Sequence, residues 1–121
     1  MNKLENLKSI AEIEFKEIVK HAYIKNYKLR IILTDGSFIE VVISQKLKNK
    51  FSFHWECLDN CIYRYDNFPD KKARKLKTFP YHFHNGSQEN IVESQFSKEI
   101  VEGFREFLTF VSEKIKPEKQ E

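Results

Sequence analysis

The segment from Arg64 to His84 carries the residue types best suited to acid–base chemistry and phosphate binding in this chain. His82 and His84 flank Phe83, so both imidazoles point to one face if the segment is extended. Histidine titrates near neutral pH, and two imidazoles on one surface can divide the work of a base and an acid. In RNA cleavage, one would take the proton of a ribose 2′-hydroxyl and the other would protonate the leaving oxygen. The alternative is that both are polar residues on an exposed strand face.

A basic segment between these residues could bind phosphate. Its cations lie within residues 71–77, which include no acid: Lys71, Lys72, Arg74, Lys75 and Lys77. Together with Arg64, a lysine of this segment would neutralise the charge that develops on a phosphate, without a metal. Such a run is usually a solvated loop and less often a phosphate-binding edge.

His54 and Asp66 join the candidate site through a predicted hairpin. Aromatic residues alternate with polar ones over residues 51–57 and 61–66, and residues 58–60 suit a turn, in which Asn60 can take the left-handed conformation. A three-residue turn places His54 opposite Arg64, and Trp55 opposite Tyr63. One face of the hairpin is then aromatic core. The other carries His54, Arg64 and Asp66, where Asp66 could orient an imidazole or hold the arginine.

Asp66 and Asn67 also suit a turn, since their side chains bond local backbone amides, and we assign only this role to Asn67. With His82 and His84, Asp66 meets the minimum for a zinc or manganese site. No further strong ligand has a fixed spacing, and His54 would have to join from the neighbouring hairpin. We therefore expect no structural metal and no cofactor, and we leave a catalytic metal open.

Cys57 and Cys61 are the two cysteines of the chain. Direct pairing across the hairpin would bring their Cα atoms to about 4.5 to 5.5 Å, within range of a disulfide. We favour the alternative of two small core thiols, which a reducing cytosol would leave unbonded.

The remaining patterns predict the elements that hold this segment. A short N-terminal helix is followed by a strand to about Ile24, and residues 27–34 and 38–44 form a hairpin around Asp35-Gly36. Residues 81–84 form a further short strand, which Asn85-Gly86 closes. Apolar residues recur at helical spacing over 97–116, and Pro117 ends that helix.

We therefore predict an α+β fold: an antiparallel sheet of about five or six strands, with the short N-terminal helix and the long C-terminal helix packed on its aromatic face. A chain of 121 residues forms one domain, 1–121, with a charged tail from about 117. The net charge of +3 is too small to indicate a nucleic-acid partner. The charged N-terminus is neither a signal peptide nor a membrane span, so we expect a cytoplasmic protein without membrane contact.

Two motifs carry a resemblance to a known family. They are Arg64-Tyr65-Asp66-Asn67-x-Pro69 and Phe79-Pro80-x-His82-x-His84, preceded by the Asp35-Gly36-Ser37 hairpin. In these the chain resembles the TumE family, the toxin half of a small prokaryotic toxin–antitoxin module. The resemblance implies a toxin neutralised by direct contact with an antitoxin, usually a DNA-binding protein.

The chain departs from the family pattern at one point. In that pattern a histidine tends to follow the proline of the first motif, whereas Asp70 and Lys71 stand there in this sequence. If the missing histidine takes part in catalysis, the departure implies altered or absent activity.

Three functional hypotheses follow from these patterns. The first is a toxin that cleaves RNA by histidine acid–base chemistry. The second is a non-catalytic module that binds nucleic acid or an acidic antitoxin through its basic face. The third is a homodimer formed through an exposed strand edge.

Overall fold

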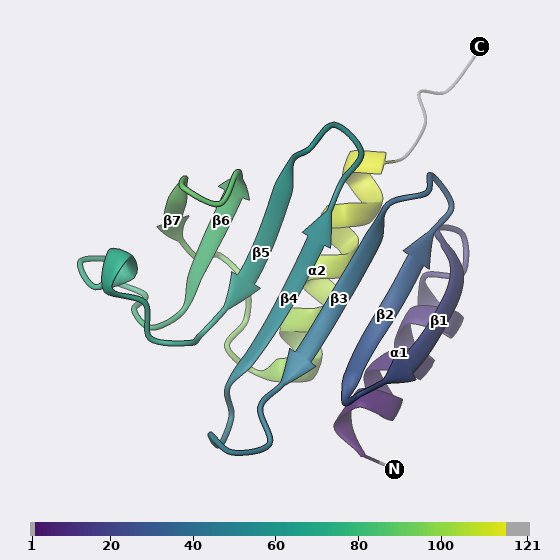
Figure 1. Cartoon of the computed structure of the whole chain (residues 1–121), viewed down its shortest axis with the longest axis horizontal. Coiled ribbons are helices and arrows are strands. Elements are labelled where there is room, and N and C mark those ends of the chain that lie inside the picture. Colours follow the sequence, from purple (N-terminus) through teal and green to yellow (C-terminus); the bar gives the residue numbers. More distant parts are fainter. Residues whose placement is uncertain (1, 116–121) are drawn as a thin grey trace.

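The structure is a computed structural model that describes residues 2–115. It contains one antiparallel sheet of seven strands, whose spatial order follows their order in the sequence (Figure 1). The strands are β1 (Val19–Lys25), β2 (Lys28–Leu33), β3 (Phe38–Ile43), β4 (Phe51–Glu56), β5 (Ile62–Asp66), β6 (His82–Gly86) and β7 (Ile91–Glu93).

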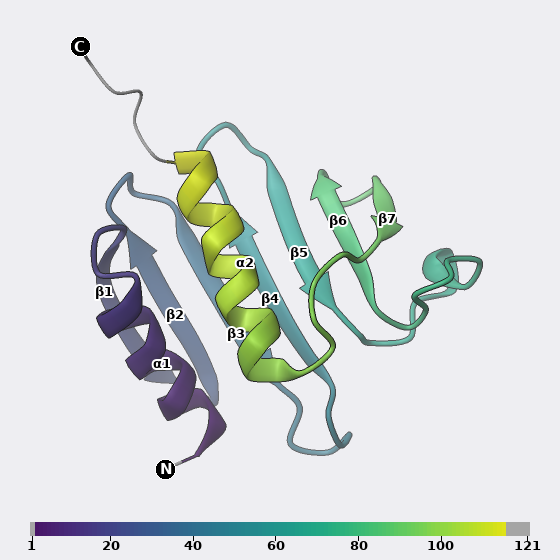
Figure 2. The same cartoon turned by 180° about the vertical axis from the view of Figure 1, so that it is seen from behind.

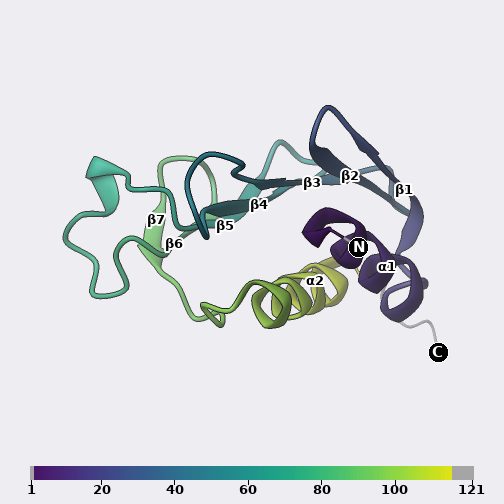
Figure 3. The same cartoon turned by 90° about the horizontal axis from the view of Figure 1, so that it is seen from below.

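Two helices lie on the same face of this sheet. In Figure 2, which views the sheet from this side, helix α1 (Lys3–Glu14) lies in front of β1 and β2, and α2 (Ile100–Ile115) crosses in front of β3 and β4. Figure 3 shows the two layers from below, with both α-helices on one side, while no α-helix of residues 2–115 covers the opposite face of the sheet. The α+β prediction is therefore confirmed. The predicted tail and Pro117 lie outside the described residues.

Both predicted hairpins are confirmed, with the expected turn chemistry. Gly36 has φ +94°, and the Asp35 carboxylate accepts a hydrogen bond from the Ser37 amide at 2.8 Å. In the second hairpin Trp55 pairs with Tyr63, His54 pairs with Arg64, and Asn60 has φ +62°. The period-two pattern and the turn residues fixed these registers, because a shift by one residue would bury the polar face.

The expected strand count is wrong, since β7 was not foreseen. Strand β6 continues through Asn85 and Gly86, and the turn comes after them, with the Asn85 amide donating to the Asn90 carbonyl at 2.8 Å. Strand β7 has only three residues, which is too short to show a period. The start of β2 also differs, because Tyr27 has φ +63° and belongs to the preceding turn.

The helix-facing side of the sheet is an aromatic core. Phe53 is fully buried, and its ring lies 5.4 Å from that of Phe104 and 5.9 Å from that of Phe107 on α2. Tyr65 is also fully buried, and its hydroxyl donates to the Ser97 carbonyl at 2.6 Å, just before α2. Within residues 2–115, no helix has the length and apolarity needed to cross a membrane.

Cys57 and Cys61 form a disulfide at the end of the second hairpin, with Cα atoms 5.3 Å apart. The favoured expectation of two free core thiols is wrong. Direct cross-strand pairing brings the two sulfurs within reach of each other, and Cys57 is only partly buried against the core.

Candidate functional site

A row of polar side chains crosses the face of the sheet that the helices leave open. Each member pairs in register with the next, from β2 to β6, in the order Arg30, Glu40, His54, Arg64 and His84. A neighbouring row places Asp66 opposite His82. The structure thus brings all five residues of the predicted acid–base site onto one face.

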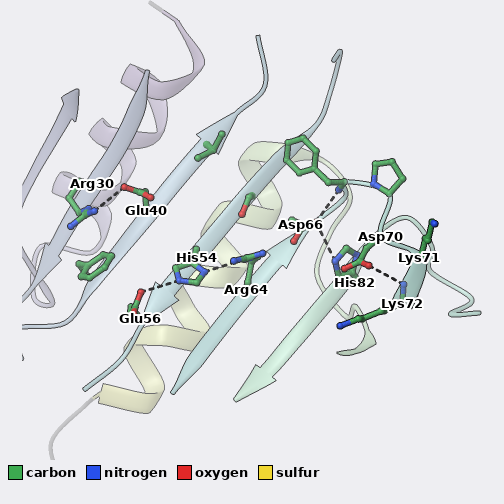
Figure 4. Close-up of a pocket in the computed structure, with 15 residues that line it drawn as sticks. Arg30, Glu40, His54, Glu56, Arg64, Asp66, Asp70, Lys71, Lys72 and His82 are labelled. Atoms are coloured by element: carbon green, nitrogen blue, oxygen red, sulfur yellow. Dashed lines mark hydrogen bonds and ion pairs between the residues drawn. The ribbon is translucent and has the colours of Figure 1, made fainter. Parts of the chain in front are cut away.

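A pocket of about 940 Å³ lies on this face, between the row and the segment around the short 3-10 helix η1 (Lys71–Ala73) (Figure 4). The predicted residues that line it are His54, Arg64, Asp66, Lys71, Lys72 and His82. Arg30, Glu40, Glu56 and Asp70 also line it and were missed by sequence reasoning. Extending the strand register from His54 to the outer strands would have found Arg30 and Glu40, since pairing fixes the row.

At the centre of the pocket, His54 lies in a short chain of hydrogen bonds. The Arg64 Nε–H donates to His54 Nδ1 at 3.1 Å, and His54 Nε2 lies 3.3 Å from a Glu56 carboxylate oxygen. Burial, together with the positive charge of Arg64, lowers the pKa of His54, although Glu56 and Glu40 act in the opposite direction. The ring is therefore neutral at pH 7, with a hydrogen on Nε2.

The second polar group of the site is buried. Asp66 is 4% exposed, and His82 and His84 are each 1% exposed. His82 Nε2 lies 3.3 Å from Asp66 Oδ1, and His84 Nε2 lies 3.8 Å from Asp66 Oδ2. We call these three residues the Asp–His–His cluster.

Backbone carbonyls hold the other nitrogen of each ring. His82 Nδ1 lies 2.8 Å from the Pro80 carbonyl, and His84 Nδ1 lies 2.9 Å from the Gln88 carbonyl. A carbonyl only accepts, so each Nδ1 carries the hydrogen. Burial lowers the pKa of His84 and raises the pKa of Asp66, because it disfavours the charged form of each group.

The alternative of two exposed histidines is wrong, because the segments on either side of β6 reach over both rings. The acid and base roles of His82 and His84 stay a prediction. Both rings turn Nε2 towards Asp66, whereas the side chain of His54 is 18% exposed. His54 is therefore better placed to meet a substrate.

The basic segment is exposed at each of its cations, and it extends beyond β6 and β7 at the edge of the sheet (Figure 1). Lys71 and Lys72 line the pocket, but Arg74, Lys75 and Lys77 do not. The Asp70 carboxylate accepts from the Lys72 amide at 2.9 Å and caps η1.

Asn67 has a structural role, but not the local turn bonding that the sequence suggested, which Asp66 supplies by accepting from the Phe68 amide at 3.0 Å. The Asn67 side chain accepts from the Phe51 amide at 2.9 Å and donates to the Asn49 carbonyl at 2.7 Å. These two hydrogen bonds to the backbone hold the start of β4 against the chain that follows β5. They leave Asp66 as the functional candidate of the pair.

Comparison with known protein families decides the identity of the chain. The family model described as Toxin TumE matches residues 4–115, nearly the whole chain. The chain belongs to the TumE family. Membership in this toxin family implies the toxin component of a toxin–antitoxin system and therefore an antitoxin partner. No curated protein and no solved structure matched the chain.

Proposed function

We propose that this TumE protein is a ribonuclease that binds an RNA phosphate in the pocket on the open face of the sheet. The observation that supports it most is the hydrogen-bonded pair of Arg64 and His54 lining this pocket. A guanidinium binds phosphate oxygens through two parallel hydrogen bonds, and an imidazole transfers protons near neutral pH. In this pair Arg64 would bind the phosphate and His54 would transfer the proton.

The geometry suggests an order for these events. In the free protein Arg64 occupies the lone pair of His54 Nδ1. A phosphate that draws the guanidinium away would free this nitrogen to accept the proton of a ribose 2′-hydroxyl. The 2′-oxygen would then bond to phosphorus as the bond from phosphorus to the 5′-oxygen breaks, and the charged His54 would return the proton to that leaving oxygen. Arg64 would then neutralise the charge that develops on the phosphate. Lys71 and Lys72, at the η1 side of the pocket, would hold the neighbouring backbone phosphates (Figure 4).

Induced expression of matched variants tests this function, with growth and total RNA integrity followed together. The wild type should arrest growth and break down RNA, and Arg64→Gln should do neither. Arg105→Gln is the control, because Arg105 pairs with Glu14 on the helical layer, away from the pocket. Growth arrest with intact RNA in the wild type would overturn the ribonuclease, and so would RNA breakdown by a folded Arg64→Gln protein.

The second candidate function is a binding module without catalysis. The exposed cations of residues 71–77 favour this candidate. Three of them, Arg74, Lys75 and Lys77, do not line the pocket. They would bind nucleic acid or an acidic surface of the antitoxin, which in the expected module is a DNA-binding protein. Binding should weaken steeply with salt, because phosphate contacts release counterions. Charge reversal at Lys71, Lys72 and Arg74 that leaves binding unchanged would contradict this candidate.

A homodimer remains the third proposal. Strands β1 and β7 form the two edges of the sheet, and each has one neighbour in the chain. Such an edge can pair with a second copy. Light scattering on the purified protein tests this, and a strict monomer would exclude it.

A further inference from the structure

We propose that Asp66, His82 and His84 bind a divalent transition-metal ion at the floor of the pocket. Within residues 2–115, this is the one group of His, Cys, Asp or Glu side chains that meets the geometric requirement for a metal site. Its three ligand atoms all lie within 4.8 Å of one another. The proposal rests on the proposed function, because it places the ion in the same pocket, beside Arg64. Its test uses no RNA.

The hydrogen positions in the cluster support this assignment. A neutral imidazole that donates from Nδ1 has its lone pair on Nε2. Both rings donate from Nδ1 to backbone carbonyls, and both turn Nε2 towards the carboxylate of Asp66. Two nitrogen lone pairs therefore face the carboxylate, His82 Nε2 towards Oδ1 and His84 Nε2 towards Oδ2, and an ionised carboxylate also only accepts. A cation at their centre would satisfy all three.

A proton does not satisfy the cluster equally well. Among residues 2–115, the buried His84 Nε2 finds no hydrogen-bond partner, and its 3.8 Å separation from Asp66 Oδ2 is too long for a hydrogen bond. A buried nitrogen without a partner is destabilising, because it has lost its hydrogen bond to water without gaining another. Adding a hydrogen to this nitrogen would therefore leave a buried donor without an acceptor, whereas a metal ion needs the lone pair itself.

The spacing of the ligand atoms fits a bound ion. Two ligands at about 2.1 Å from a tetrahedral ion lie about 3.4 Å apart. His82 Nε2 lies 3.3 Å from Asp66 Oδ1, His84 Nε2 lies 3.8 Å from Asp66 Oδ2, and one ligand atom from each residue lie within 4.8 Å of one another. Modest side-chain movements would therefore bring the three ligands to this spacing. The Nδ1–carbonyl hydrogen bonds are the support that metal-binding histidines commonly have, since they fix the ring orientation.

The donor set selects the class of metal. Two imidazole nitrogens and one carboxylate oxygen suit zinc, manganese or iron(II), whereas calcium and magnesium prefer oxygen ligands throughout. Three protein ligands leave at least one position open, as in catalytic sites. Asp66 and His82 line the pocket, so that position would face it. An ion there would supply a Lewis acid for a phosphate oxygen or a water.

Calorimetry on untagged protein treated with a chelator gives the first test, with Zn²⁺, Mn²⁺, Ca²⁺ and Mg²⁺ as separate probes. We expect one Zn²⁺ or Mn²⁺ per chain and weaker Ca²⁺ or Mg²⁺ binding. In His84→Asn the amide can still donate to the Gln88 carbonyl, but the Nε2 ligand is gone. This variant should bind at least about a hundredfold more weakly. His21→Asn, at an exposed histidine of β1, is the control and should bind as the wild type does.

Nuclear magnetic resonance of the imidazole nitrogens gives a second test that needs no variant. Zn²⁺ should shift Nε2 of His82 and His84 and leave His21 unchanged. Absence of Zn²⁺ and Mn²⁺ binding by the wild type would overturn the proposal. Full-strength binding by a folded His84→Asn protein, or shifts confined to other histidines, would overturn it as well.

The outcomes separate this proposal from the ribonuclease. If no metal binds while toxicity still depends on Arg64 and RNA breaks down, the metal site alone is wrong. If one ion binds through His82 and His84 but RNA stays intact during growth arrest, the ribonuclease alone is wrong.

Discussion

Strands β5 and β6 bury side chains on both faces, but the two faces differ in how their polar atoms are satisfied. On the helix side, fully buried Tyr65 directs its hydroxyl to the Ser97 carbonyl at 2.6 Å. On the opposite side, His84 is almost equally buried, yet its Nε2 has no hydrogen-bond partner in the described part of the chain. The aromatic side is therefore complete in itself, whereas the polar side holds a buried nitrogen that is unpaired among residues 2–115.

This difference shows that the helix side of the sheet stabilises the fold, whereas burial on the polar side destabilises it. An antiparallel sheet usually packs one face on the core and exposes the other to water. Burying apolar rings is favourable, but burying carboxylates and imidazoles is costly unless they are fully paired. Burial of Asp66, His82 and His84 on the second face therefore lowers the stability of the fold. A functional role explains this loss of stability better than a role in folding does.

Phe53→Ala should give the largest effect, since it removes a ring from the complete side. Phe53 is fully buried among the rings of Tyr65, Phe104 and Phe107. We expect the free energy of unfolding to fall by about 3–5 kcal/mol in chemical denaturation. Ile13→Ala on α1, where Ile13 is 71% exposed, should change it by less than about 1 kcal/mol. Similar losses in both variants would show that this side is not closely packed.

Gly103→Ala sharpens the comparison by testing how closely the helix side is packed. An added Cβ would lie 2.7 Å from the Ser97 carbonyl oxygen and 3.2 Å from the Tyr65 ring. Overpacking of this kind costs about 1–3 kcal/mol, which should outweigh the helix propensity that alanine gains over glycine. Thermal unfolding measures the loss, and the exposed α2 substitution Glu113→Ala is its control. An increase in stability would mean that α2 can move away from β5.

The same comparison separates what the sequence could predict from what it could not. Alternation along residues 51–57 and 61–66 predicted which side chains share a face, so the pairing of His54 with Arg64 was foreseen. Strict periodicity carries this information because each strand residue alternates sides. It also carried His82 and His84 onto the same face as Asp66.

Burial of the polar face was not predictable in this way. It depends on the Pro80 and Gln88 carbonyls, which lie in irregular segments on either side of β6. Such segments follow no hydrophobic period, so the sequence does not show what they cover. For the same reason β7 and the end of β6 were missed. The metal was left open because spacing alone could not show that three ligand atoms converge.

Asp66→Asn tests whether the buried carboxylate on the polar side stabilises or destabilises the fold. In chelator-treated protein the amide oxygen can still accept from the Phe68 amide, as Asp66 Oδ1 does at 3.0 Å. The new NH₂ takes the place of Oδ2, from which it can donate to His84 Nε2 once the two side chains move closer than the present 3.8 Å, and a buried negative charge disappears. We expect the free energy of unfolding to rise by about 1 kcal/mol, while growth arrest is lost. A fall of about 2 kcal/mol or more would show that the carboxylate stabilises the fold, and the polar side would then be complete without a metal.

His54→Asn should give the smallest effect, and it appears as a change in pH dependence. His54 faces Arg64 on β5, Glu40 on β3 and Glu56 on its own strand, and its pKa is lowered chiefly by burial and then by Arg64. The unfolded chain therefore binds this proton more readily than the folded protein does. Stability falls as the pH drops through about 6.5, the ordinary histidine value, and this contribution stops changing below the lowered pKa. Denaturation at pH 7.5 and pH 5 should show a smaller loss on acidification in His54→Asn than in the wild type. Equal losses would mean that the Arg64–His54 pair does not hold the ring neutral. The proposed role of His54 as a base would then lose this support.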